Sequence, residues 1–199
     1  RLLEKEDISD ETAAWYSGKP VKLKRVKEAS QQANELISRE LVWKVHFEVA
    51  QCEERGVEIA SAGMHRVKGV DMQQARDALL NGARLSYAQS LLASPVNLRW
   101  KVLVATARLE LSAGDVAKAR SILGQAFEEV PEKSKPSVYL ESSRVEEFIG
   151  DIDAARERLS EACNELQGDW KCSLELVLLE LRAGHPRRAL AVAVAALHV

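Results

Sequence analysis

The sequence predicts an all-α fold, a right-handed solenoid of antiparallel helix pairs, and two observations lead to it. First, four segments of the chain can be superimposed on an anchor residue, Trp or Pro, that stands ten residues before a glutamate. The anchors with their glutamates are Trp43 and Glu53, Trp100 and Glu110, Pro136 and Glu146, and Trp170 and Glu180. Second, the last two repeat units are 36 and 34 residues long, a period at which paired helices stack into a superhelix.

Glycines that follow the last three glutamates predict where each pair turns. Gly114, Gly150 and Gly184 each stand four residues after their glutamate, and glycine tolerates the left-handed conformation that ends a helix. A two-residue hinge at this point makes the flanking helices antiparallel. Alanines follow each glycine at fixed distances, where small side chains let two helices approach closely. These alanines are Ala119, Ala126, Ala155, Ala162, Ala189 and Ala196.

The second repeat shows the predicted pair in full. We expect Asn97 to cap a first helix over residues 98–113, and Asp115 to cap a second helix after the hinge. Apolar residues at helical spacing predict that one face of the first helix is buried. That face holds Trp100, Leu103, Val104, Ala107 and Leu111, and the opposite face holds Lys101, Arg108 and Glu110.

The third and fourth repeats follow the same plan. Pro136 opens a helix that ends at Ile149, because proline fits the first turn of a helix. In the fourth repeat, a helix begins at Trp170, and Pro186 opens the last helix. That last helix is apolar on nearly every side, and such helices are normally covered on both faces. We therefore expect further repeats to follow it, or self-association through it.

The first repeat departs from the plan. Its helices are predicted over residues 38–55 and from Asp71, with the longer connection GVEIASAGMHRVKGV between them. This insertion is expected to be a surface loop, which is either tolerated variation or a binding element. The predicted domain organisation is a charged segment over 1–37, which includes a helix of a preceding repeat, and a repeat array over 38–199.

Composition indicates a soluble helical protein, with 46% apolar and 29% charged residues. The formal net charge of −2 gives no overall attraction to nucleic acid or membranes. No apolar run approaches the roughly 18 residues of a membrane span. Three cysteines, Cys52, Cys163 and Cys172, show no paired spacing and are interpreted as small buried thiols. Neither they nor the four histidines have metal-ligand spacing, so no metal and no cofactor is predicted.

No catalytic motif is recognisable, and we expect no enzymatic activity. The chain lacks a phosphate-binding loop and a nucleophile elbow. Adjacent glutamates at 53–54, 128–129 and 146–147 are interpreted as solvated faces, because neighbouring residues on a helix point in different directions.

Two sets of residues could contact nucleic acid. The basic residues Lys19, Lys22, Lys24, Arg25 and Lys27 form the densest charge run. They are interpreted as a solvated face or linker, and the alternative is contact with phosphates. Trp43, Trp100 and Trp170 are interpreted as core residues between helices, and the alternative is a base-stacking platform.

With these motifs in view, the segment RWKVLVATARLELSAGDVAKARSILGQAF resembles the HAT (half-a-TPR) repeat of RNA-processing scaffolds. The shared features are Trp100, Glu110, the Gly-Asp hinge and the pair Ala119-Arg120. Ala155-Arg156 and Ala75-Arg76 repeat that pair, whereas Ala189-Leu190 loses the arginine. Pro136 departs from the aromatic residue usual in the family, although Tyr139 is close enough to fill the space. The resemblance covers about residues 39–199.

The resemblance implies a superhelical scaffold in a ribonucleoprotein or other large assembly, with protein partners and a nuclear location. Two alternatives stay open, namely direct RNA binding by the array and a scaffold unrelated to RNA. Each repeat carries as many acids as bases, which counts against RNA binding.

A set of recurring positions is predicted to hold the repeats together. It consists of Trp43, Trp100, Trp170, Glu110, Glu146, Glu180, Arg120 and Arg156. Both arginines recur together with a glutamate on a first helix, so each is expected to donate charge-assisted hydrogen bonds to a carboxylate or a helix-end carbonyl.

Overall fold

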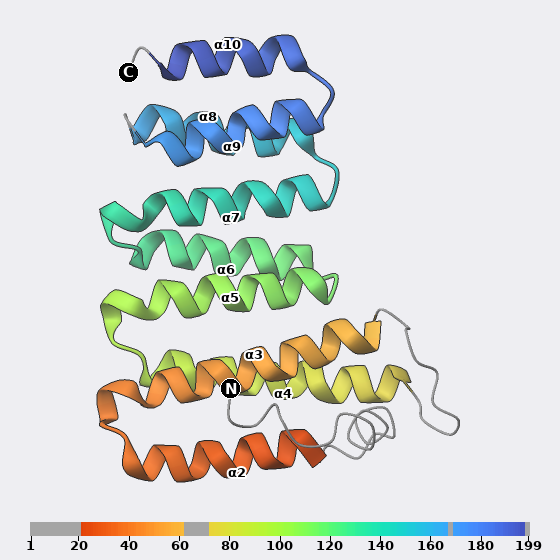
Figure 1. Cartoon of the computed structure of the whole chain (residues 1–199), viewed down its shortest axis with the longest axis vertical. Helices are drawn as coiled ribbons and strands as arrows, with labels where there is room; N and C mark the ends of the chain where they lie inside the picture. Colours follow the sequence, from red (N-terminus) through yellow and green to blue (C-terminus); the bar gives the residue numbers. More distant parts are fainter. Residues whose placement is uncertain (1–20, 62–71, 167–168, 198–199) are drawn as a thin grey trace. The chain divides into compact units, whose positions relative to one another are not determined.

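The computed structural model describes residues 21–61, 72–166 and 169–197, and these ranges form helices and short connections without a strand. The α-helices are α2 (Val21–Leu36), α3 (Val42–Ser61), α4 (Met72–Ala93), α5 (Arg99–Ser112), α6 (Val116–Glu129), α7 (Lys135–Phe148), α8 (Ile152–Glu165), α9 (Trp170–Arg182) and α10 (Pro186–Ala196). Short 3-10 turns over Arg39–Leu41, Val96–Leu98 and Glu132–Ser134 precede α3, α5 and α7. Consecutive helices pack as pairs (Figure 1), so the predicted all-α solenoid is confirmed.

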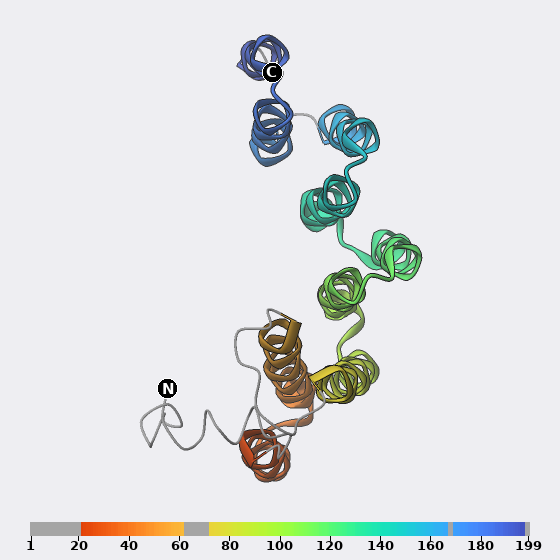
Figure 2. The same cartoon turned by 90° about the vertical axis from the view of Figure 1, so that its right-hand side faces the viewer.

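The chain divides into two compact units, Arg1–Pro95 and Val96–Val199. In the second unit, α5, α7 and α9 form one layer, and α6 and α8 form another, as the view along the helices in Figure 2 shows. α7 and α9 each pack against their own partner and against the second helix of the preceding pair, and α5 packs against α6. We call the layer of α5, α7 and α9 the first-helix layer.

The predicted hinges are present in all three pairs of this unit. Gly114, Gly150 and Gly184 have φ angles of 90°, 87° and 78°, in the left-handed region. The backbone N–H of Asp115 donates to the carbonyl of Glu110 at 2.9 Å, which satisfies an acceptor that the end of the helix leaves free. The carboxylate of Asp115 then accepts from the N–H of Lys118 at 3.0 Å and caps the next helix.

The predicted cap at Asn97 is wrong. This residue lies within the 3-10 turn Val96–Leu98, and Leu98 occupies the cap position of α5 without a side-chain hydrogen bond. The chain enters α5 directly from this turn, so the carboxamide of Asn97 is not at the cap position.

Small side chains let the two layers approach closely, as predicted. Ala119, Ala126, Ala155 and Ala162 are fully buried between helices. Around Ala155, the core is completed by Leu159, Leu176 and Leu179, with Leu140 packed against them. These contacts join three successive helices, α7, α8 and α9, so burial continues from one pair to the next.

The three tryptophans do not share one environment. Trp43 and Trp100 are buried, as predicted, but Trp170 is 66% exposed, so its predicted burial is wrong. The indole lies at the start of α9 beside the end of α10, which has 11 residues where α6 and α8 have 14.

The first unit holds a longer helix pair. α3 has 20 residues and α4 has 22, and α2 packs against α3. The insertion predicted as a loop begins inside α3, because residues 56–61 continue the helix. Val57, in this extension, is only 1% exposed, so packing favours helix over loop there. The rest of the insertion, residues 62–70, lies outside the described residues.

Candidate interaction surface

Four glutamates at the same repeat position are buried, each 5% exposed or less: Glu53, Glu110, Glu146 and Glu180. The prediction that Glu110 lies on an outer face, and that Glu53 and Glu146 are solvated, is therefore wrong. The reason is that each carboxylate has a charged partner whose own side chain reaches the surface. For Glu110 that partner is Lys118, whose Nζ lies 2.6 Å from Oε1.

Arg120 and Arg156 supply the partners in the next two repeats. Arg120 on α6 donates through two nitrogens to both carboxylate oxygens of Glu146 on α7, with Nε 2.9 Å from Oε1. Arg156 on α8 makes the same two-bond contact with Glu180 on α9, with Nη2 3.2 Å from Oε2. In both cases the arginine belongs to one helix pair and the glutamate to the next.

These bonds change the acid–base properties of both partners. The hydrogen bonds from Arg156 hold the pKa of the Glu180 carboxyl below its usual value. The same bonds raise the pKa of Arg156, and the bonds to Glu146 raise that of Arg120. The Arg156–Glu180 pair is therefore ionised at neutral pH, and both arginines have the geometry of a fixed, two-bond salt bridge.

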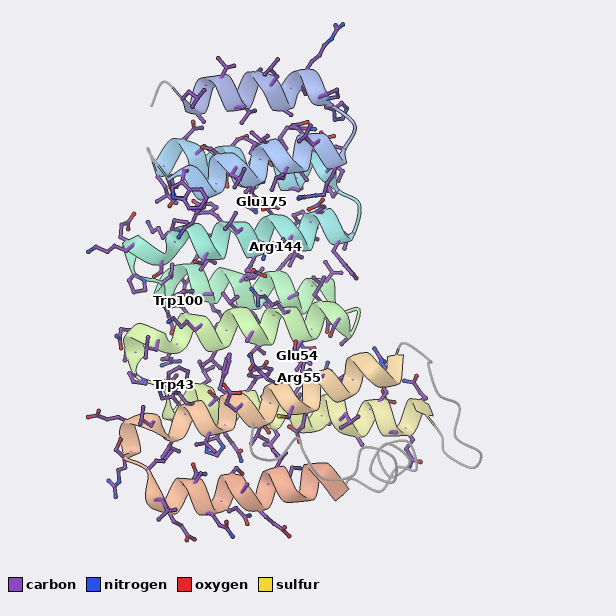
Figure 3. The ribbon with its side chains drawn as sticks, in the orientation of Figure 1. Trp43, Glu54, Arg55, Trp100, Arg144 and Glu175 are labelled. Carbon is purple, nitrogen blue, oxygen red and sulfur yellow. The ribbon has the colours of Figure 1, made fainter. Side chains whose placement is uncertain are left out.

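A second set of ion pairs lies along the first-helix layer. Arg108 on α5 and Arg144 on α7 both donate to Glu141, each at 2.7 Å. Arg182 on α9 donates to Glu147 on α7 at 2.6 Å and to Glu175 at 2.8 Å. Figure 3 shows Arg144 and Glu175 on neighbouring helices of this layer. These bonds tie α5, α7 and α9 to one another without involving the second helices.

The carboxylates of this second set are more deeply buried than the arginines above them. The side chain of Glu141 is 10% exposed, whereas those of Arg108 and Arg144 are 56% and 51% exposed. A molecule that approaches this side of the layer therefore meets guanidinium groups first.

Further cations share the same side of these helices. Lys101 stands seven residues before Arg108, and Lys171 eleven before Arg182, spacings that return to one helix face. Both lysines are exposed, while Glu141, Glu147 and Glu175 are buried or half-buried. We call this surface the cationic face, and its residues are Lys101, Arg108, Arg144, Lys171 and Arg182.

The basic run near the N-terminus belongs to the first unit, whereas the cationic face belongs to the second. Lys22, Lys24 and Arg25 lie on α2, and their side chains, like Lys19 as a whole, lie outside the described residues. Lys27 places its ammonium group 3.3 Å from the buried carboxylate of Glu53. This contact gives Lys27 a partner within the protein, and phosphate contact by the run stays a prediction.

In the described ranges, no three His, Cys, Asp or Glu side chains come together as metal ligands. Burial raises the pKa of the Cys172 thiol to about 12, which keeps this sulfur protonated and unreactive at neutral pH. None of the described helices is long and apolar enough to cross a membrane.

Sequence reasoning missed the cationic face, although a signal for it was present. Lys101 and Arg108 were predicted on the outer face of their own helix, and Arg144 was not singled out. Superimposed by repeat, Arg108 and Arg144 occupy the same position, six residues before their hinge glycine. The acids that offset these bases lie beneath them, a difference in depth that a count of charges does not reveal.

Comparison with known proteins gives one result. The family described as PRP6, TPR-like domain, matches the chain over residues 1–199. No curated protein matches the chain at a significant level.

Proposed function

Because the chain belongs to the family of the PRP6 TPR-like domain, we propose that it is a non-catalytic scaffold that holds protein partners in a splicing assembly. The family is one of splicing factors, which supports a nuclear location. TPR-like repeats are typically scaffolds rather than enzymes. The recurring Trp, Glu and Arg positions have structural roles in this proposal, because they hold one pair to the next.

The cationic face is the observation that carries the proposal. Five exposed cations lie over three covered carboxylates, so the surface is positive although the chain as a whole carries −2. A rigid layer of helices fixes the spacing of these cations, and complementary charge speeds association and excludes wrong partners. The proposed partner is therefore a protein segment that presents carboxylates to α5, α7 and α9.

A charge-reversal experiment tests this assignment. Arg144→Glu in the full-length protein is compared with Arg158→Glu, and partners are identified by affinity purification and mass spectrometry. Arg158 is a matched control, because it is 49% exposed and lies on α8, in the other layer. We expect Arg144→Glu to lose acidic partners at least tenfold, and Arg158→Glu to keep them. Equal loss, or none, would reject the cationic face as the binding surface.

Direct RNA binding is the second candidate, and the same surface favours it because phosphates also bind guanidinium groups. A mobility-shift assay with single-stranded RNA separates the two functions. The scaffold proposal expects RNA binding no tighter than the roughly 1–100 µM typical of non-specific contacts. If the protein binds RNA specifically and with salt sensitivity, and Arg144→Glu removes that binding, direct RNA binding would replace the scaffold proposal. Partners without any connection to RNA processing would instead support a scaffold of another kind.

A further inference from the structure

The last helix pair exposes a continuous apolar surface. Large side chains on α9 and α10 lie on it at helical spacing, and Leu190 at its centre is 65% exposed. We call this surface the end face. Its residues are Trp170, Leu174, Leu178 and Leu181 on α9, and Leu190, Val194 and Leu197 on α10.

The preceding pair shows what an equivalent face does when it is covered. On α7 and α8 this face is covered by α9, and its contacts are charged. Glu147 accepts from Arg182 at 2.6 Å, and Arg156 donates to Glu180. The same interface also holds apolar contacts, since Leu140 on α7 and Ala155 and Leu159 on α8 pack with Leu176 and Leu179 on α9.

The end face has lost the charges of that interface. A shift of 34 residues, the last repeat length, aligns Arg144 with Leu178, Glu147 with Leu181, and Arg156 with Leu190. All three charged positions have become leucine, whereas the apolar position is unchanged, because Leu140 aligns with Leu174. The end face therefore has leucine where the covered face has Arg144, Glu147 and Arg156, and its exposed cations, Arg187 and Arg188, lie at the start of α10.

A groove beside the end face shows a second change. Between α6, α7 and α8 the rings of Phe127 and Tyr139 fill the interface, with centroids 4.8 Å apart. The equivalent residues in the next repeat are Cys163 and Ser173, whose Sγ and Oγ lie 3.7 Å apart. These smaller side chains leave a groove of about 690 Å³ between α8, α9 and α10, lined mainly by apolar atoms. Trp170, Leu174 and Leu197 belong to both the groove and the end face.

We propose that the end face binds the first helix of a further repeat, stacked as α9 is stacked on α7 and α8, with uncharged residues at its contacts. Where α7 presents Glu146 and α9 presents Glu180, the bound helix presents an apolar side chain. A carboxylate buried against Leu190 would lose its hydration without gaining the two-bond arginine contact that Glu146 and Glu180 have, and this cost selects the neutral helix. The inference rests on the repeat interfaces and does not depend on which partners the cationic face binds.

A grafted repeat tests this preference in the whole chain. Val199 stands fifteen residues after Gly184, as Glu129 stands fifteen after Gly114. A second copy of residues 130–165 can therefore follow Val199 in register. Two versions of the copy are made, one with Glu146 unchanged and one with Glu146→Leu. Each version is fused to the parent chain and to the Leu190→Arg chain, which gives four fusions. Leu190→Arg without a copy is the control, and its melting temperature should not change, because Leu190 is exposed.

The four fusions form a double-mutant cycle in melting temperature. The matched fusions are Leu190 with the Glu146→Leu copy, and Leu190→Arg with the Glu146 copy. We expect each to melt about 6–12 °C above its mismatched counterpart, the range expected when one member of a buried ion pair is left alone. Additive effects, with no coupling between the two positions, would overturn the proposal. A dimer of the unextended chain in sedimentation equilibrium, abolished by Leu190→Arg, would also overturn it, since a second copy would then occupy the end face.

Discussion

The pairs α3–α4 and α7–α8 bury the same kinds of residue although their connections differ. α7 and α8 have 14 residues each and meet at the hinge that begins with Gly150. α3 and α4 are longer, and ten residues separate them in the sequence. Each pair nevertheless buries an anchor, a glutamate and fully enclosed alanines. These buried residues, rather than the hinge, therefore determine how two helices pair.

The two buried glutamates differ in what holds them. Glu53 accepts a hydrogen bond from the Ser86 hydroxyl of its own partner helix at 2.8 Å. A Cβ on Gly82 would lie only 2.6 Å from its Oε1, so the carboxylate sits close to the backbone of α4. Glu146 is instead held by Arg120 of the preceding pair. Glu53 therefore supports the pairing of α3 with α4 in addition to its contact with Lys27 of α2, whereas the contact of Glu146 with Arg120 fixes the spacing between pairs.

The largest effect is expected at the anchors. Trp100→Ala should lower the free energy of unfolding by about 3–5 kcal/mol, because it removes a large buried side chain. Trp170→Ala should change it by less than about 0.5 kcal/mol, since this indole is mostly exposed. Thermal unfolding followed by circular dichroism measures both. Equal losses would show that Trp170 is covered in solution.

The hinge should matter less than the anchors. Gly150→Ala forces a side chain into the left-handed region, at φ 87°, and should cost about 1–2 kcal/mol. Its control is Gly124→Ala on α6, where nothing lies within 4 Å of an added Cβ. That change should gain about 0.5–1 kcal/mol from helix propensity. If Gly150→Ala were as harmful as Trp100→Ala, the hinge would have to be regarded as a determinant of pairing.

A smaller difference separates two glycines inside helices. Gly82→Ala brings the same gain in propensity as Gly124→Ala, but the new Cβ displaces the Glu53 carboxylate from its hydrogen bond with Ser86. We expect Gly82→Ala to be at least about 1 kcal/mol less favourable than Gly124→Ala, from urea unfolding curves. Equal gains would mean that Glu53 moves without loss and does not support the pair.

The weakest predicted effect concerns acid. The pKa of Glu180 is lowered in the folded protein by Arg156, so this pair stabilises the fold above the pKa of the unfolded carboxyl, about 4.3. The contribution is lost as pH falls through the lower, folded pKa. The stability difference between the wild type and Arg156→Met should therefore shrink below about pH 4. A difference that grows toward acid would contradict this assignment.

The repeat pattern was enough to predict the three glycine hinges and the helix ends beside them, because these depend on local residues such as Gly114 and Asp115. Burial of the glutamates was harder to predict, since Arg120 precedes Glu146 by 26 residues. The exposure of Trp170 depends on which side chains of α9 and α10 surround it, and the spacing of the anchors in the sequence does not predict those neighbours. The cationic face depends on the depth of Glu141 beneath Arg108 and Arg144, a tertiary property.

The central claim is that Arg120 and Arg156 hold successive pairs together, whereas Arg144 on the cationic face binds partners. The most direct test measures melting temperature and recovered partners for Arg156→Met and Arg144→Met in the same full-length protein. Arg156→Met leaves Glu180 buried beside only His185, at 3.4 Å, and should cost about 2–4 kcal/mol while partners are still recovered at low temperature. Arg144→Met should keep the melting temperature, because Arg108 still neutralises Glu141, and should lose partners. If Arg156→Met kept its melting temperature and lost a protein or RNA ligand, the two classes of arginine would be reversed and the account would be wrong.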